Sequence, residues 1–313
     1  MIRTYRITDL AEYINWLYFF HACGLPPKMA SVAKLHGCEA CRIAWIETFS
    51  EADREKARQA SKLFADAGQM LARLTPFLMV KAAVELFPAN ADGDDIVLFS
   101  PQDENKEVGR LPMLRQQSPG NDGFCRSLAD YIRPLRQGQR DRIGLFAVAA
   151  HNDAPMLSAS RQLTSLQPDL STADGYEQLL IQTLSDRLAE AAAEVLHMEV
   201  RRTLWGYAPD EQLTIDELHA ETYQGIRPAV GYPSLPDLSL NFVLDTLLDF
   251  SRVGITLTEH AMMQPHASVS GLMMAHPEAN YFSVGPISEE QLVDYAQRRK
   301  LPVNTLRTYL QTR

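Results

Sequence analysis

The sequence predicts a mixed α+β fold, a single domain in which helices flank antiparallel strands. Long amphipathic segments predict helices near both ends of the chain, and short apolar runs joined by tight turns predict strands in the middle. The two kinds of segment do not alternate regularly, as they would around a parallel sheet. Antiparallel pairing is therefore expected.

The composition is that of a folded protein and argues against several classes of function. Of 313 residues, 46% are hydrophobic and 22% are charged. The net charge of -9 argues against general binding of nucleic acid, which needs Lys and Arg for its phosphates. No apolar run reaches the ~18 residues of a membrane helix, no signal-peptide core is present, and 4 cysteines do not make a disulfide scaffold. A cytoplasmic protein without a membrane or nucleic-acid partner is expected.

Two helices are predicted in the first quarter of the chain. An acidic capping pattern precedes the apolar residues of a segment at about 9–22, which ends before a glycine and two prolines. Ser50 and Asp53 begin a second helix that extends to about Leu74, with apolar residues at helical spacing.

The middle of the chain is predicted to form strands. Residues 81–87 and 95–99 are short apolar runs, and residues 88–94 between them have the Pro, Asn, Asp and Gly composition of a connecting turn. A helix is expected near 124–132. Residues 143–150 are apolar and predict a buried strand.

Residues 151–174 are rich in Ser, Pro, Asp and Thr, which predicts a loop. This loop is the best candidate for an internal boundary, but long loops also occur within domains, so residues 1–313 are taken as one domain. The longest helix is expected at about 176–204. The last third is predicted to contain helices near 215–222 and 240–250, strands near 256–259, 267–274 and 281–284, a helix capped by Ser288 and Gln291, and a helical C-terminus.

The motifs of several common enzyme classes are absent. The sequence has no G-x-G-x-x-G, P-loop, H-E-x-x-H or G-x-S-x-G, so a generic dehydrogenase, NTPase or hydrolase has little support. One C-x-x-C pair is present, Cys38 and Cys41, shortly after His36. It is compatible with a structural or incidental role, a zinc site or redox chemistry. One pair with scattered further ligands predicts no tightly bound zinc.

Glu190, Glu194 and His197 lie at positions i, i+4 and i+7 on one face of the predicted long helix. Three interpretations stay open. Glu194 and His197 match half of a carboxylate-bridged di-iron site, although no other helix offers the second half. The residues could form a polar stripe, or one carboxylate could contact a ligand.

The segment 225–233, with the sequence G-I-R-P-A-V-G-Y-P, is a second candidate site. Its glycines and prolines favour an irregular backbone whose N–H and C=O groups need partners outside regular ladders. Arg227 offers a planar fork for a carboxylate, and Tyr232 offers an aromatic face. The segment suits a small zwitterionic ligand with a heterocycle, although a rigid surface turn explains the same composition.

Several motifs together resemble the activation domain of cobalamin-dependent methionine synthase, its S-adenosylmethionine-binding module. Residues 227–233 are similar to the family's R-P-A-P-G-Y-P loop, with Val230 in place of a proline. The other matches are Y-I-N-W at 13–16, L-F-P-A-N at 86–90 with G-D-D at 93–95, W-G-Y-A-P at 205–209, Y-Q-G-I at 223–226, A-S-V-S-G at 267–271, and H-P at 276–277 with Y-F at 281–282. The resemblance extends from about residue 10 to 310.

The resemblance implies one α+β domain with a curved antiparallel sheet and flanking helices. It also implies a reactivation function, in which S-adenosylmethionine methylates the cobalamin of an enzyme inactivated as cob(II)alamin, with one electron from a flavodoxin-like donor. No segment matches a homocysteine, folate or cobalamin-binding region, so a separate methionine synthase chain would carry the cobalamin. This chain would be a methyltransferase component that acts by positioning, without a catalytic acid or base.

The resemblance also assigns the S-adenosylmethionine site. Arg227 corresponds to the Arg that contacts the ligand carboxylate, Glu190 to a ligand-contacting Glu on the long helix, and Tyr281 to a Tyr near the sulfonium. Asn15 stands where the family has an Asp that contacts the ligand's amino group, so an acceptor remains but its charge is lost. The loop positions that contact the ligand largely through backbone are Ala229, Gly231 and Tyr232.

Other departures bear on cobalamin and the partner. Residues 234–241 lack the family's His, Glu and Lys, and residues 272–274 replace an aromatic-containing run. Two alternatives to a reactivation subunit stay open. One is a non-enzymatic S-adenosylmethionine sensor or adaptor of a corrinoid protein, and the other is a metal-binding protein that uses Cys38 and Cys41.

Overall fold

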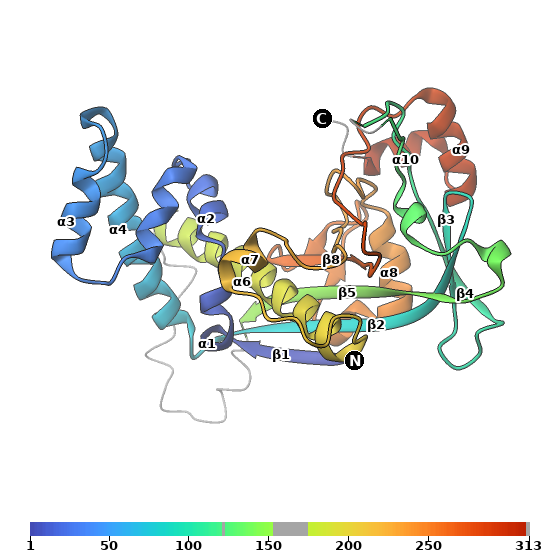
Figure 1. Ribbon diagram of the computed structural model, residues 1–313, viewed down its shortest axis with the longest axis horizontal. Helices are drawn as coiled ribbons and strands as arrows, with labels where there is room; N and C mark the ends of the chain where they lie inside the picture. Colours follow the sequence, from blue (N-terminus) through green and yellow to red (C-terminus); the bar gives the residue numbers. More distant parts are fainter. Residues whose placement is uncertain (121–122, 153–174, 311–313) are drawn as a thin grey trace. The chain divides into compact units, whose positions relative to one another are not determined.

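The computed structural model describes residues 1–120, 123–152 and 175–310 (Figure 1). They form a mixed α+β fold, which confirms the fold class expected from the sequence. The chain divides into two compact units. We call residues 4–80 and 150–192 the helical unit, and residues 1–3, 81–149 and 193–313 the sheet unit. The loop predicted at 151–174 lies outside the described residues from 153 onward.

The helical unit is built from short and long helices. Its N-terminal part contains α1 (Ile7–Leu10), the 3₁₀ turn η1 (Ala11–Tyr13), α2 (Trp16–Ala22), the 3₁₀ helix η2 (Pro27–Lys34), α3 (Glu39–Glu47) and α4 (Glu51–Leu74). The bounds of α4 confirm the helix predicted to end at Leu74. The prediction of one continuous helix at 9–22 is wrong. The helix is interrupted near Asn15, which is the N-cap of α2 and whose side chain accepts the N–H of Leu17 at 3.2 Å.

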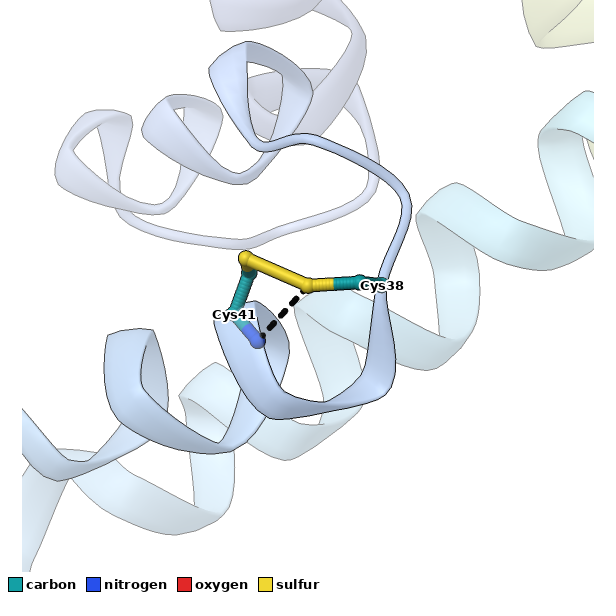
Figure 2. Close-up of a disulfide and its surroundings, with 2 residues drawn as sticks. All are labelled: Cys38 and Cys41. Carbon is teal, nitrogen blue, oxygen red and sulfur yellow. Dashed lines mark hydrogen bonds between the residues drawn. A yellow bond between two sulfur atoms is a disulfide. The ribbon is translucent and has the colours of Figure 1, made fainter.

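Two further features of the helical unit matter below. Cys38 and Cys41 are joined by a disulfide at the start of α3 (Figure 2). The long helix α6 (Gly175–Glu199) begins in the helical unit, ends in the sheet unit and continues as the π-helical turn η5 (Val200–Leu204). This course confirms the helix predicted at 176–204.

A six-stranded sheet forms the base of the sheet unit. Its strands are β1 (Ile2–Arg6), β2 (Leu78–Asp92), β3 (Asp95–Phe99), β4 (Glu107–Pro112), β5 (Asp141–Asn152) and β8 (Ser268–Met273), in the order β4-β3-β2-β5-β8 with β1 paired to β2. The pairs β2–β3, β3–β4 and β5–β8 are antiparallel. β5 is buried over 143–150, as predicted. A second sheet pairs β6 (Thr256–Leu257) with β7 (Met263–Gln264).

β2 is longer than the sequence predicts. The strand continues through Pro88 to Asp92, which pairs with Asp95, so the turn is confined to Gly93 and Asp94 rather than extending over 88–94. Gly93 adopts φ +62°, a conformation that glycine takes without steric cost. A tight hairpin therefore replaces the expected connecting loop.

Two predicted elements are wrong. At 124–132 only the 3₁₀ turn η3 (Leu128–Tyr131) forms, followed by η4 (Leu135–Gln137). At 281–284 no strand forms, because the apolar side chains of Phe282 and Val284 pack into hydrophobic clusters while the backbone stays irregular.

The remaining helices cover the sheet unit. They are α7 (Ile215–His219), α8 (Leu240–Leu248), η6 (Phe250–Val253), α9 (Glu289–Arg299) and α10 (Val303–Tyr309). α8 packs against β4 and β8, and α9 packs against β4 and α10. One apolar cluster lies between the sheet and α8, and a smaller one lies under α9 and α10. No described helix is long and apolar enough to cross a membrane.

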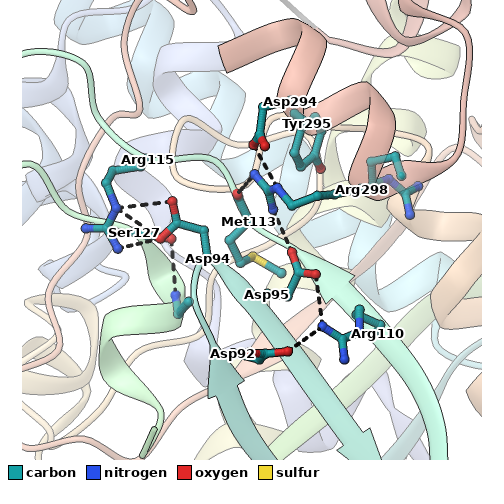
Figure 3. A network of polar contacts seen from close by, with 12 residues as sticks. Asp92, Asp94, Asp95, Arg110, Met113, Arg115, Ser127, Asp294, Tyr295 and Arg298 are labelled. Atoms are coloured by element: carbon teal, nitrogen blue, oxygen red, sulfur yellow. Dashed lines mark hydrogen bonds and ion pairs between the residues drawn. The ribbon is translucent and has the colours of Figure 1, made fainter. Parts of the chain in front are cut away.

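An ion-pair network holds α9 to the β2–β3 hairpin (Figure 3). Arg298 of α9 lies 2.6 Å from Asp95, which also accepts from Arg110 at 3.2 Å. Beside it, Arg115 pairs with Asp94 and Asp130, each at 2.6 Å. The G-D-D motif at 93–95 therefore has a structural role, because both carboxylates fix neighbouring segments to the hairpin.

Candidate functional site

The segment 225–233 lies along the edge of the sheet that β8 forms. Ile226 and Met274 exchange two backbone hydrogen bonds of 3.0 and 2.9 Å, and the N–H of Val230 donates to the carbonyl of Ser270 at 2.9 Å. The irregular backbone of the loop therefore finds its partners on β8, as buried peptide groups must. The sheet edge, in turn, is covered by the loop.

Two glycines allow this close approach. A Cβ on Gly271 would lie 2.2 Å from the carbonyl oxygen of Pro228, and a Cβ on Gly225 would lie 2.2 Å from that of Met274. Gly225 also adopts φ +86°. The motif at 267–271 thus accompanies the loop motif for a steric reason, because a larger residue at 271 would displace the loop from β8.

Arg227 is held at both its backbone and its side chain. Its N–H donates to the hydroxyl of Tyr281 at 2.9 Å. Its guanidinium nitrogens Nη1 and Nη2 lie 3.2 and 3.3 Å from Oε2 of Glu194 on α6. Both side chains are largely buried, with 12% and 10% of their surface exposed. The position of the guanidinium is therefore set before any ligand binds.

Glu194 links Arg227 to a second buried cation. Arg201, with no exposed side-chain surface, donates to Glu211 at 2.8 Å and places Nη1 3.9 Å from Oε1 of Glu194. Its guanidinium stacks 3.9 Å from the ring centre of Tyr223. Two cations and two carboxylates thus alternate, which we call the buried ion-pair chain: Arg227, Glu194, Arg201 and Glu211.

His197 lies beside the buried ion-pair chain as a neutral imidazole. It is fully buried, and its Nε2 lies 3.3 Å from the hydroxyl of Tyr207. Desolvation, reinforced by the charges of Arg227 and Arg201, lowers its pKa well below the ordinary value. Desolvation also raises the pKa of Tyr281.

Four buried polar atoms in this region lack a hydrogen-bond partner among the described residues. They are Oε1 of Glu194, Nδ1 of His197, Nη1 of Arg201 and the hydroxyl oxygen of Tyr223. Buried polar atoms are normally satisfied, so these four are exceptions in the part of the chain that the structure describes. A guanidinium has five N–H donors in a planar fork, so a single Arg can in general bond more than one carboxylate. This donor set fits a zwitterionic ligand.

The structure brings most of the predicted ligand-binding residues into one unit. Ala229 is buried, Gly231 adopts φ +88°, and the side chain of Tyr232 is 50% exposed on the same loop as Arg227. Asn15 and Glu190 belong to the helical unit, where Asn15 caps α2 and Glu190 lies one turn before Glu194 on α6. Their contacts with a ligand stay predictions.

Two carboxylates near Arg227 were not predicted as site residues. The spacing of Glu194 with Glu190 and His197 left it open as half of a metal site, part of a polar stripe or a ligand contact, but its pairing with Arg227 spans 33 residues and leaves no local pattern. The pKa of Glu221 is raised, mainly by desolvation, despite the opposing charge of Arg227; this residue adopts φ +55° and had no sequence signal. Among the described residues, no group of three or more His, Cys, Asp or Glu could hold a metal ion.

Comparisons with known proteins point to one family. Residues 6–300 match the family model of the vitamin B12 dependent methionine synthase activation domain. The chain is also similar to a protein of known structure, the MetH reactivation domain in a crystal structure with bound AdoHcy. The two share 33% sequence identity and superpose with a TM-score of 0.77 over 100% of this chain and 91% of that chain.

Proposed function

The chain belongs to the family of vitamin B12-dependent methionine synthase activation domains, and from this premise we propose that it binds S-adenosylmethionine and reactivates a separate methionine synthase chain. That partner carries the cobalamin, and a flavodoxin-like protein supplies one electron to its inactive cob(II)alamin form. The similar MetH domain has AdoHcy bound, and AdoHcy is S-adenosylmethionine without the transferred methyl group.

The observation that carries this proposal is the fixed position of Arg227. Glu194 holds its guanidinium and Tyr281 accepts its N–H, which fixes the position of the residue that the resemblance assigns to the carboxylate of the ligand. Ala229, Gly231 and Tyr232 follow on the loop and contact the rest of the ligand.

Two predicted residues complete the proposed site. We expect Asn15 to accept a hydrogen bond from the amino group of the ligand and Glu190 to contact the ligand, as the resemblance implies.

The proposed methyl transfer requires this chain to position S-adenosylmethionine. Methyl transfer from a sulfonium to the cobalt of cob(I)alamin is a displacement in line with the breaking bond, which needs alignment and exclusion of water but no general acid or base. A preset Arg–carboxylate pair orients the ligand by one end. Such pre-organisation reduces the entropy lost when the reacting groups meet.

Binding is tested by calorimetric titration of S-adenosylmethionine into the protein and two variants. Arg227→Ala removes a charge-assisted pair worth about 1.5–3 kcal/mol, so affinity should fall roughly 10–100-fold. Arg252→Ala, which removes an equal charge from an exposed position, is the matched control and should bind normally. Unchanged affinity in Arg227→Ala would place the ligand elsewhere.

Reactivation is tested spectroscopically. A methionine synthase that lacks its own activation domain is loaded with cob(II)alamin and mixed with a one-electron donor and S-adenosylmethionine. Adding this chain should convert the spectrum to that of methylcobalamin, and Arg227→Ala should slow the conversion. Equal conversion without the chain would rule out reactivation and favour the sensor or adaptor.

A further inference from the structure

The disulfide at the start of α3 has no part in the proposed binding of S-adenosylmethionine. Cys38 is the N-cap of α3 and Cys41 lies in its first turn, with their Cα atoms 5.4 Å apart (Figure 2). Of the alternatives for the C-x-x-C pair, zinc binding would need both sulfurs as thiolates. In the structure the two sulfurs are bonded to each other instead.

The disulfide is a poor candidate for a structural cross-link. A disulfide stabilises mainly by restricting the unfolded chain, and the effect grows with the length of the loop that it closes. Here the two cysteines are only three positions apart in the sequence. α3 is held by other contacts, including its packing against α4 and the buried Trp45, whose indole N–H donates to Ser31 at 3.0 Å.

The two sulfurs differ in their access to solvent. Cys38 is exposed, as are Gly37 before it and Glu39 after it, whereas Cys41 is half-buried. Thiol–disulfide exchange requires an external thiolate to approach one sulfur along the S–S bond. Because Cys38 is the more exposed residue, its sulfur is assigned as the one attacked, and Cys41 is the group that leaves.

The start of α3 stabilises a thiolate at Cys38. The N–H of Cys41 donates to the sulfur of Cys38 at 3.2 Å, which is the capping bond of the helix. A thiolate in this position gains a charge-assisted hydrogen bond and the favourable end of the helix dipole. Glu39 also lies in the first turn of α3, and its negative charge acts against this stabilisation of the thiolate. A stabilised thiolate lowers the free energy of the dithiol relative to the disulfide, so the reduced form is accessible.

We propose that Cys38 and Cys41 form a redox-active dithiol–disulfide couple that exchanges electrons with external thiols such as glutathione or a dithiol reductant. The thiolate of the reductant attacks the sulfur of Cys38, the bond to Cys41 breaks, and Cys41 leaves as a thiolate that takes up a proton. A second reductant thiolate attacks the mixed disulfide and releases Cys38. Two electrons pass to the cysteine pair, and the reductant ends as its own disulfide.

The couple is tested in the full chain with Cys23→Ser and Cys125→Ser, which removes the free cysteines. The folded protein is equilibrated at a series of ratios of reduced to oxidised glutathione, quenched with acid, alkylated and weighed by mass spectrometry. We expect a reversible transition between no alkylated cysteine and two. A pair that stays oxidised in excess reduced glutathione until the protein is unfolded, or that never oxidises, would overturn the proposal.

The attacked sulfur is tested with single variants in the same background. With oxidised glutathione, Cys38 in the Cys41→Ser variant should displace one glutathione thiolate and form a stable mixed disulfide. This should be at least about tenfold faster than the same reaction of Cys41 in Cys38→Ser, because reactivity follows exposure and thiolate character. Equal or reversed rates would overturn the assignment of Cys38. Neither result depends on S-adenosylmethionine binding, so this proposal and the proposed function can fail separately.

Discussion

Asn15 combines a structural bond with a predicted ligand contact. Its Oδ1 caps α2, and Asp is as good an N-cap as Asn. Asn15→Asp should therefore preserve α2 while adding an opposite charge beside the ligand's ammonium. We expect S-adenosylmethionine to bind more tightly by roughly 0.5–1 kcal/mol in a solvated site, measured by titrating both proteins side by side.

The control for Asn15→Asp is Asn105→Asp, which adds the same charge at an exposed turn. This variant should bind S-adenosylmethionine like the unmodified chain. If Asn15→Asp binds more weakly, Asn15 has adapted to a contact other than the ligand's amino group.

His197 makes stability depend on pH. Its folded pKa is held well below the ordinary value by desolvation, Arg227 and Arg201, while the unfolded chain protonates it near pH 6.5. The unfolded state thus binds a proton that the folded state excludes. Stability should therefore fall as pH drops below about 6.5, by up to about 1.4 kcal/mol per unit from this residue.

The measurement compares urea unfolding of the chain and of His197→Gln on either side of that pH. The difference in slope between the two proteins isolates His197 from other titrating groups. His260→Gln, at an exposed histidine, is the matched control and should keep the slope of the unmodified chain. A His197→Gln slope equal to that of the unmodified chain would show that His197 takes up a proton as readily in the folded state as in the unfolded state.

At the scale of elements, the contact between the loop and β8 makes Gly271 essential. Gly271→Ala forces a Cβ toward the carbonyl of Pro228, which the structure places 2.2 Å away, so the loop that carries Arg227 must shift. Overpacking of this kind typically costs about 1–3 kcal/mol. We expect lower stability in urea unfolding together with weaker S-adenosylmethionine binding.

Gly68→Ala is the opposite case. Gly68 lies in α4 with no atom within 4 Å of the added Cβ, so the substitution should stabilise the chain by roughly 0.5–1 kcal/mol through helix propensity.

Normal binding and stability in Gly271→Ala would mean that the loop does not depend on its close approach to β8.

Other elements show how far local patterns lead. α4 and β5 formed as predicted, since apolar spacing within each segment is enough to specify them. Residues 281–284 have the same short apolar pattern as a strand, but Phe282 and Val284 are drawn into hydrophobic clusters instead. Short apolar runs are ambiguous for this reason, because burial and strand pairing select the same residue types.

For the molecule as a whole, we expect the purified chain to be colourless and to contain no stoichiometric zinc. No segment resembles a cobalt-ligating motif, and a single C-x-x-C pair gives no assured tetrahedral ligand set. Absorbance in the visible range and elemental analysis measure both. A corrinoid spectrum, or about one zinc per chain, would contradict the expectation.

The site residues predicted on the loop, Arg227, Ala229, Gly231 and Tyr232, are close in sequence, so residue types and the resemblance were enough to propose them. The partners of Arg227 could not be predicted in this way. Glu194 lies 33 residues away and Tyr281 lies 54 residues away, and the two reach opposite parts of the same residue, its guanidinium and its N–H.

Local chemistry was sufficient for the α+β class, the long helices, the buried strand and the candidate loop, because helical and strand periodicity and turn propensity act between near neighbours. The folded chain was needed to place the loop on the edge of β8 and to set Glu194 between two arginines. Packing decides these contacts. The free energy of burying a charge or a peptide group depends on which distant segment supplies its partner, and that is settled only when the core forms.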